Sequence, residues 1–232
     1  GGPFFQAVFH RVDPSVEVVQ VEEEGAWLTG GEVAFWLNGP ARSVLSAERT
    51  ALNILQRLSG TATLTRQFVD AIEGTDAKVI DTRKTTPGMR AMQKHAVRVG
   101  GGLNHRFGLD SGVLIKENHI ASAGGVSRAV ELARASSPHG LKIEVEVTNE
   151  AEFEAALIAG ADIIMLDNMP SPLMSRLVRR AREHTRPVML EASGNLGLER
   201  VAEVAQTGVD FLSIGALTHS APAADLSMRF TR

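Results

Sequence analysis

The chain shows two patterns of hydrophobic and polar residues, and the change between them comes near Gly74. Before it, residues 16–21 and 32–37 alternate in polarity, which predicts two strands of a small sheet with one solvated face. From about Ala47, apolar residues recur three to six positions apart, which predicts a helix that Gly60 interrupts. These apolar residues are Leu52, Leu55, Leu58, Leu64 and Phe68.

After Gly74, short apolar runs rich in β-branched residues alternate with helical patterns. The runs cover residues 78–81, 112–116, 141–147, 162–166, 187–191 and 210–214, and helical patterns between them include 126–135, 150–159, 172–183 and 198–207. Runs of this kind are typical of parallel strands that are buried on both faces. Six β/α units at these intervals favour an α/β fold with an incomplete (β/α) barrel, although spacing alone leaves a doubly wound sheet open.

Composition fits an ordinary globular protein and narrows the chemistry. The 232 residues are 44% hydrophobic and 22% charged, enough for one large domain or two modest ones. The absence of cysteine excludes disulfides, thiolate nucleophiles and Cys-ligated metals, and it fits a cytoplasmic protein. No apolar run approaches the roughly 18 residues that cross a bilayer, and no leader pattern opens the chain, so we expect no membrane association.

Charge is unevenly distributed. The net charge of −3 argues against nucleic-acid binding, yet residues 83–119 carry seven Lys or Arg against two acids, which leaves +5 there and −8 elsewhere. A local positive field in an acidic chain predicts a focused site for a small polyanion. A solvated helix face accounts well for Arg90, Lys94 and Arg98. It accounts poorly for the cations at strand ends and Gly-rich turns, which are Arg83, Lys84, Arg106 and Lys116.

Each of the six predicted strands ends in polar or small residues. The endings are Asp81-Thr82-Arg83-Lys84, Lys116-Glu117-Asn118-His119, Glu144 with Glu146, Asp167-Asn168, Glu191-Ala192-Ser193-Gly194-Asn195 and Ser213-Ile214-Gly215-Ala216. Because working groups of parallel α/β folds lie where strands finish, six such endings predict a site at that edge of the sheet.

The last two endings have the composition of a phosphate site. The small residues of Ser193-Gly194-Asn195 and Gly215-Ala216 let backbone N–H groups approach a phosphate closely. The helix predicted from Leu198 adds a positive dipole end. The competing interpretation is that these glycines only form tight turns, and the sequence leaves both open.

Glu144 and Glu146 are two positions apart on one strand, so both point to the same side, which in a barrel is the interior. An unpaired carboxylate is costly there, and Lys116, or Mg²⁺ held together with Asp167, would offset the cost. A purely structural ion pair is the alternative, and it suits Glu144 better than Glu146.

Candidate groups for an anionic substrate lie outside the strands. His105 and Arg106 follow three glycines, and Arg83, Arg106 and Arg49 could each grip a carboxylate through a planar fork. Arg49 could equally be a surface charge on a helix. Lys116 within an apolar strand could form a Schiff base, as in an aldolase-like barrel.

Eight sequence motifs occur together along the chain. They are Glu48-Arg49-Thr50-Ala51-Leu52-Asn53, Asp81-Thr82-Arg83-Lys84-Thr85-Thr86-Pro87-Gly88, Gly101-Gly102-Leu103-Asn104-His105-Arg106, Leu114-Ile115-Lys116-Glu117-Asn118-His119, Glu144-Val145-Glu146-Val147, Met165-Leu166-Asp167-Asn168, Ser193-Gly194-Asn195 and Gly215-Ala216-Leu217-Thr218-His219. In this order, and over essentially the whole chain, the sequence resembles the quinolinate phosphoribosyltransferase family.

The resemblance implies an activity and roles for named residues. The family joins 5-phosphoribosyl-1-diphosphate to quinolinate with Mg²⁺, giving nicotinate mononucleotide, CO₂ and diphosphate. The expected catalytic residues are Lys116, Glu146 and Asp167, and the latter two would also meet the ribose and the Mg²⁺. The implied quinolinate and phosphate contacts are Arg49, Thr82, Arg83, Lys84, His105, Arg106, Ser193, Gly194, Asn195, Ile214, Gly215 and Ala216.

The resemblance also implies a domain organisation. Residues 1–59 would form an N-terminal α/β sandwich domain completed by 221–232, and 60–220 would form the catalytic barrel. Family members usually have a longer N-terminal part, so we expect a truncated sandwich in a chain that begins at Gly1 without Met. Arg49 would reach into the partner subunit's site, which implies a homodimer or a higher homo-oligomer.

Three alternatives compete with this interpretation. A sibling phosphoribosyltransferase acting on nicotinate or nicotinamide, or a molybdenum-transport-associated relative, would share the fold, but a monocarboxylate would leave several buried cations uncompensated. A Schiff-base aldolase would use Lys116. A ligand-binding or regulatory barrel would bind both substrates without releasing diphosphate.

Overall fold

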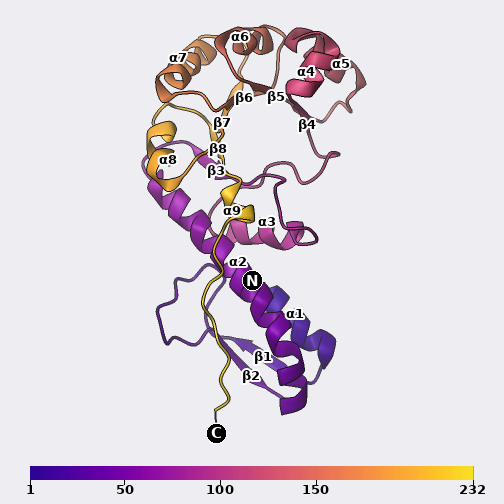
Figure 1. The fold of residues 1–232 in the computed structure, drawn as a ribbon, viewed down its shortest axis with the longest axis vertical. Coiled ribbons are helices and arrows are strands. Elements are labelled where there is room, and N and C mark those ends of the chain that lie inside the picture. Colours follow the sequence, from indigo (N-terminus) through magenta and orange to yellow (C-terminus); the bar gives the residue numbers. More distant parts are fainter. Residues whose placement is uncertain (232) are drawn as a thin grey trace. The chain divides into compact units, whose positions relative to one another are not determined.

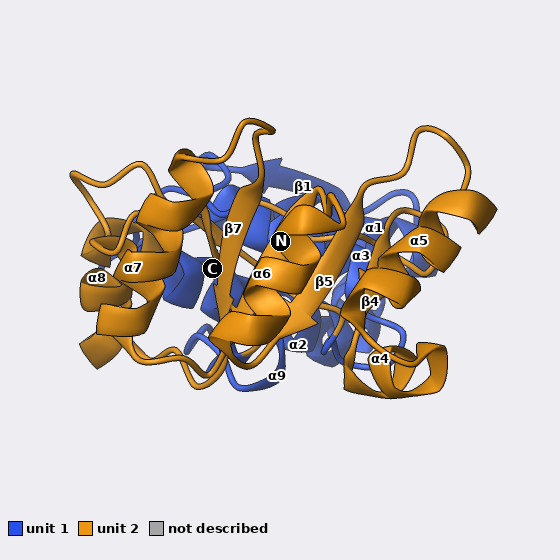
Figure 2. Cartoon of the chain, turned by 90° about the horizontal axis from the view of Figure 1, so that it is seen from above, with its two compact units in different colours: residues 1–66, 84–102, 216–232 blue, residues 67–83, 103–215 orange. Residues whose placement is uncertain are grey.

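A computed structural model describes residues 1–231, which form two compact units (Figures 1 and 2). Unit 1 contains residues 1–66, 84–102 and the segment that starts at Ala216, and unit 2 contains residues 67–83 and 103–215. In chain order the elements are α1 (Gly2–Val12), β1 (Glu17–Gln20), β2 (Phe35–Asn38), α2 (Ala41–Ala71), β3 (Lys78–Ile80), α3 (Arg90–Val99), β4 (Val113–Ile115), α4 (Glu117–Ala123), α5 (Val126–Ser136), β5 (Ile143–Val147), α6 (Glu150–Ile158), β6 (Ile163–Asp167), α7 (Ser171–Arg182), β7 (Met189–Ser193), α8 (Leu198–Ala205), β8 (Phe211–Ser213) and α9 (Ala216–His219).

Strands β1 and β2 of unit 1 form the predicted small antiparallel sheet, with Val19 paired to Trp36. These two side chains are exposed, whereas Val18 and Leu37 pack on the core, so the sheet has one solvated face as expected. The sequence pattern did not predict α1. The apolar face of α1 is short, and the helix is stable because Phe5 and Phe9 are buried in that same core.

Helix α2 corrects the sequence prediction in two respects, because it begins before Ala47 and continues through Gly60. The backbone carbonyl of Pro222 lies so close to Gly60 that a Cβ there would overlap it. Hydrogen bonds hold the C-terminal segment in this position: Gln56 Nε2 donates to the Leu226 carbonyl at 2.8 Å and Arg57 Nη1 to the Ala221 carbonyl at 2.9 Å. Gly60 therefore allows close packing and does not break the helix.

Replacing Gly60 with alanine is expected to lower the free energy of unfolding by about 1–3 kcal/mol, because the new methyl group overlaps the Pro222 backbone. The higher helix propensity of alanine offsets only about 1 kcal/mol of this loss. Urea unfolding measures the effect. Gly140→Ala, at a position with no neighbouring atom within 4 Å, is the control and should stay within about 0.5 kcal/mol of the parent. Equal stability of Gly60→Ala and the parent contradicts the steric role.

Helix α3 corrects a second expectation. Its cations were expected on a solvated face, but the Lys94 side chain is buried, with 3% of its surface exposed, while Arg98 is exposed. The buried side of α3 also contains Gln93, whose Oε1 accepts from the Thr86 N–H at 2.8 Å and whose Nε2 donates to the Thr218 carbonyl at 2.7 Å. Helix α3 thus ties the segment after Lys84 to α9 within unit 1.

Unit 2 is built on a parallel sheet in the order β3-β8-β7-β6-β5-β4, which confirms the six predicted strands. From β4 to β8 each strand lies beside the next, and β3 follows β8, so the order never reverses as it does in a doubly wound sheet. This is the progression of a barrel that stays open between β3 and β4. Leu103 forms an isolated parallel bridge with Ile80 on the remaining edge of β3.

Alternation along these strands separates a helix-covered face from an inner face. Val145, Ile164, Leu190 and Leu212 are completely buried, and helices α5, α6 and α7 run along the outside of the strands (Figure 2). The registers place Glu146 beside Met165 and Met165 beside Glu191, so these residues share the inner face. Among the described residues, no helix is long and apolar enough to cross a membrane.

Candidate active site at the carboxyl ends of the parallel strands

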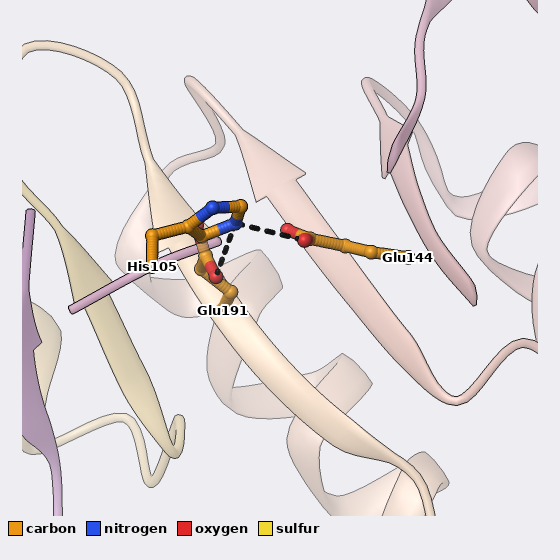
Figure 3. Close-up of side chains that lie close together, drawn as sticks. All are labelled: His105, Glu144 and Glu191. Carbon is orange, nitrogen blue, oxygen red and sulfur yellow. Dashed lines mark hydrogen bonds and ion pairs between the residues drawn. The ribbon is translucent and has the colours of Figure 1, made fainter. Parts of the chain in front are cut away.

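His105 lies between two buried glutamates from different strands of unit 2 (Figure 3). Its Nε2 is 2.9 Å from Oε2 of Glu144 on β5 and 3.9 Å from Oε2 of Glu191 on β7. The expectation that Glu144 faces the interior is confirmed, since only 4% of its surface is exposed. Burial and the neighbouring charge of Glu144 raise the pKa of Glu191 well above its ordinary value.

The end of β3 supports the loop that carries His105 and Arg106. Asp81 is fully buried, and its carboxylate accepts from Asn104 Nδ2 at 2.7 Å and from the His105 backbone N–H at 2.8 Å. A buried carboxylate with several donors holds them in fixed positions. Asp81 therefore links a strand end to the residues that the sequence assigns to substrate binding.

Arg106 is a partly desolvated cation. Its Nη1 donates to the Gly112 carbonyl at 2.8 Å, whereas Nε is buried without a hydrogen-bond partner. Burial and the positive charge of Arg83 lower the pKa of Arg106, and the charge of Glu144 opposes this effect. An anionic ligand would supply both the negative charge that these two cations lack and the acceptor that the buried Nε lacks.

Lys116 and Glu146 form an ion pair between the end of β4 and the inner face of β5. The Lys116 side chain is 49% exposed and that of Glu146 is 18% exposed. The sequence analysis offered Lys116 as a partner for either Glu144 or Glu146, and the structure pairs it with Glu146. The ion pair therefore holds the lysine side chain at the open end of the sheet.

The ends of β6 and β7 form a joined pair of turns. Asn168, Gly194 and Asn195 adopt left-handed conformations with φ of 52°, 96° and 47°. Asn168 Nδ2 donates to Asp167 Oδ2 at 2.9 Å, and Asn195 Nδ2 donates to Asn168 Oδ1 at 3.3 Å. Helix α8 begins soon after, at Leu198, as the sequence predicted. The small residues thus make tight turns, and these turns also present backbone groups at the site edge.

The structure distributes the predicted site residues over both units. Unit 1 contains Arg49, Lys84 and Ala216, and there Arg49 is exposed on α2 while the Lys84 carbonyl accepts from Thr218 Oγ1 at 2.9 Å. Unit 2 contains His105 and Arg106, which lie in the loop between α3 and β4. The other predicted residues of unit 2 lie at or just beyond its strand ends: Thr82, Arg83, Lys116, Glu146, Asp167, Ser193, Gly194, Asn195, Ile214 and Gly215.

Sequence reasoning gave no role to three residues that the structure places in the site. Glu191 contacts His105, Asp81 holds the loop before it, and Asn168 joins the two turns. For Glu191 a signal was present, because it stands two positions before Ser193 and therefore on the same face of its strand. Asp81 and Asn168 contact residues that are distant in sequence, and the periodicity of hydrophobic residues does not predict such contacts.

Comparisons with known proteins agree with one another. Residues 1–59 match the family profile of the N-terminal domain of quinolinate phosphoribosyl transferase, and residues 61–229 match that of its C-terminal domain. A protein of Bacillus subtilis named probable nicotinate-nucleotide pyrophosphorylase [carboxylating] is 42% identical over 231 residues, covering 100% of this chain and 79% of its own length. A Mycobacterium leprae protein named nicotinate-nucleotide pyrophosphorylase [carboxylating] is 47% identical over 206 residues, covering 89% of this chain and 72% of its own.

Solved structures give the same result for the fold. NadC from Streptococcus pyogenes matches with a TM-score of 0.93 at 41% identity, covering 98% of this chain and 80% of that one. The nicotinate-nucleotide pyrophosphorylase from Francisella tularensis matches with a TM-score of 0.93 at 44% identity, with the same coverage. The α/β architecture expected from the sequence is thereby confirmed.

Proposed function

The chain belongs to the quinolinate phosphoribosyltransferase family, and from this premise we propose how its own residues carry out the reaction. The enzyme transfers the phosphoribosyl group of 5-phosphoribosyl-1-diphosphate to quinolinate with decarboxylation, in the biosynthesis of NAD. The products are nicotinate mononucleotide, CO₂ and diphosphate. The assignment of residues to steps is our proposal.

Quinolinate binding rests on Arg106, and its buried, unpartnered Nε beside the charge of Arg83 is the observation that carries the proposal. A pyridine dicarboxylate supplies two negative groups, which matches a cluster of cations better than a monocarboxylate does. His105 joins this set, and Lys84 and Arg49 complete it as further cations.

The transfer step needs charge placement and no protein nucleophile. The bond from ribose C1 to the diphosphate oxygen breaks, and the quinolinate ring nitrogen forms the new bond to C1. Glu146 and Asp167 stabilise the positive charge that develops on the ribose, and Lys116 stabilises the departing diphosphate. The bond between the ring carbon and the carboxylate next to the nitrogen then breaks, and CO₂ leaves. The electron pair of that bond stays on the ring carbon, stabilised by the adjacent pyridinium nitrogen, and a proton from solvent then binds there.

Two rival chemistries are less well supported. A Schiff-base lysine must lose its charge, which desolvation favours, whereas Lys116 is half exposed and paired with Glu146. A non-catalytic binding barrel does not agree with relatives that are named as enzymes and cover 100% and 89% of this chain.

Mg²⁺ fits the donors that the site provides. Glu146 and Asp167 are carboxylates at the ends of neighbouring strands, and hard carboxylate oxygens together with substrate phosphates are ligands that Mg²⁺ prefers. We propose that these two residues hold it. When bound, the ion neutralises charge on the diphosphate.

A phosphate cradle at residues 193–195 and 214–216 is part of the same proposal. Replacing Gly194 with alanine places a Cβ against the Asn168 amide at a φ of +96°. We expect the KM for 5-phosphoribosyl-1-diphosphate to rise by about tenfold or more, because the turn must shift. Initial-rate kinetics measure it. Gly124→Ala, with a φ of +86° and no atom within 4 Å, carries similar strain and should leave this KM unchanged. An equal rise in this KM for Gly194→Ala and Gly124→Ala would contradict the phosphate-binding role of the cradle.

A homodimer or higher homo-oligomer is proposed from Arg49, which is exposed on α2 and would act in the partner subunit's site. Mixing inactive Arg49→Ala and Asp167→Asn subunits is then expected to restore about a quarter of the parent activity, because some sites in mixed oligomers contain neither change. Diphosphate release from the remixed proteins measures this. No recovery after verified subunit exchange contradicts the trans role.

Two further assignments are also proposals. We assign residues 1–59 with 221–232 to a sandwich domain and 60–220 to the catalytic domain, following the motif order along the chain. A cytoplasmic location fits a chain without cysteine.

The decisive assay is quinolinate-dependent release of diphosphate, with and without Mg²⁺. We expect turnover with quinolinate and Mg²⁺ and little without the metal. A preference for nicotinate over quinolinate would overturn the substrate assignment, and trapping of a carbonyl substrate by borohydride would support the aldolase instead.

A further inference from the structure

Glu144 and Glu191 stand apart from the carboxylates that the mechanism uses. Both are almost completely buried on the inner face of the sheet, and both face His105 (Figure 3). Their Oε1 atoms are buried without hydrogen-bond partners, while their Oε2 atoms lie 2.9 Å and 3.9 Å from His105 Nε2. A pair of buried acids is costly, so its presence next to a substrate-binding histidine needs a reason.

The two acids are not equivalent. Burial and the charge of Glu144 raise the pKa of Glu191 well above its ordinary value, which favours the protonated form of Glu191. One carboxylate oxygen of Glu191 lies within 4.8 Å of one of Glu144. A protonated carboxyl can donate a hydrogen bond, whereas an ionised one only accepts, so a proton on Glu191 reduces the repulsion between the two acids.

We propose that Glu144 is a positioning residue that orients the His105 ring for quinolinate, and that Glu191, whose carboxylate oxygen lies within 4.8 Å of that of Glu144, holds Glu144 in place. The proposal rests on the proposed function. Glu144 accepts the Nε2–H of His105, so the tautomer and the rotation of the ring are fixed before the substrate arrives. The backbone of His105 is held independently by Asp81, at 2.8 Å. Nδ1 is then the ring nitrogen left for the substrate, and it donates to a substrate carboxylate only when it takes up a proton as quinolinate binds.

A metal ion is the competing occupant, since the three side chains place ligand atoms within 4.8 Å of one another. Metal binding would require Glu191 to lose its proton and Nε2 to offer its lone pair. Nε2 lies 2.9 Å from Glu144 Oε2, a hydrogen-bond distance at which an ionised Glu144 accepts from a protonated Nε2. The observations therefore favour orientation of a substrate-binding ring.

The first test compares two conservative variants of the intact enzyme. Glu144→Gln is expected to raise the KM for quinolinate about tenfold, with the KM for 5-phosphoribosyl-1-diphosphate within about twofold, because a charged acceptor is lost from the ring. Glu191→Gln keeps a polar side chain of the same shape and should show a smaller loss than Glu191→Leu, which should reproduce the Glu144→Gln defect. Glu203→Gln, at an exposed position on α8, is the matched control.

The second measurement remains informative even where turnover is lost. Side-chain ¹H–¹⁵N spectra report which nitrogen of His105 carries the proton. In the parent and in Glu191→Gln we expect Nε2–H, and in Glu144→Gln a mixture of tautomers. Metal analysis of the purified enzyme accompanies it.

The outcomes separate this inference from the function on which it rests. A parent enzyme without quinolinate-dependent diphosphate release contradicts the proposed function. An active parent whose Glu144→Gln variant keeps its KM for quinolinate and its His105 tautomer overturns the positioning role. So does a loss in Glu191→Gln as large as that in Glu191→Leu, or a stoichiometric metal that disappears with Glu191→Gln.

Discussion

Replacing Arg106 with alanine raises the KM for quinolinate by about 100-fold, while the KM for 5-phosphoribosyl-1-diphosphate changes by less than about threefold. The side chain is anchored through Nη1 to the Gly112 carbonyl and keeps a buried Nε without a partner, so a bound carboxylate gains a desolvated, directional contact. Its removal takes away that contact and also leaves substrate charge uncompensated. Initial-rate kinetics with each substrate varied in turn measure the split.

Two variants calibrate this result. Arg106→Lys keeps the charge but loses the fork, so it should recover only part of the affinity for quinolinate. Arg98→Ala, at an exposed arginine of α3, should change neither KM. Equal losses for both substrates in Arg106→Ala would mean that the residue supports the site as a whole and does not recognise quinolinate.

The second large effect concerns the rate. Asp167→Asn is expected to lower kcat by about 100-fold to 1,000-fold while each KM changes by less than about fivefold, because the charge acts chiefly on the cationic transition state. The substitution preserves shape and removes only the charge. Asp167 accepts from Asn168 at 2.9 Å, and the asparagine retains an oxygen that can do the same.

Steady-state and single-turnover measurements locate this loss in the chemical step. Asp76→Asn, at an exposed position before the amino end of β3, removes the same charge and should leave kcat unchanged. An unchanged kcat in Asp167→Asn contradicts its role in the transition state. If the lost activity is restored at high substrate concentration, Asp167 contributes to binding only.

Periodicity predicted the strands of unit 2 well, because parallel strands buried on both faces need continuous apolar runs that the sequence displays directly. It failed at α1, whose few apolar residues become a helix only by packing Phe5 and Phe9 into a core built from distant segments. It also failed at Gly60, since local propensity treats glycine as a breaker and cannot register the Pro222 backbone beside it.

The same division applies to the candidate site. Strand endings and motifs identified the cations and carboxylates, because they depend on residue type and on position along a strand. The partners could not be deduced. Two glutamates were possible partners for Lys116. The register between β4 and β5 and the length of the lysine side chain pair it with Glu146.

The amino-acid sequence by itself determined the family, the parallel α/β architecture and the kinds of groups at the strand ends. All three depend on residue types and on their spacing along the chain. Tertiary structure alone decided that Lys94 is buried, that Arg106 keeps an unused donor, and that the pKa of Glu191 is raised next to Glu144. These properties depend on desolvation and on distances between side chains far apart in sequence, and only the folded chain creates either.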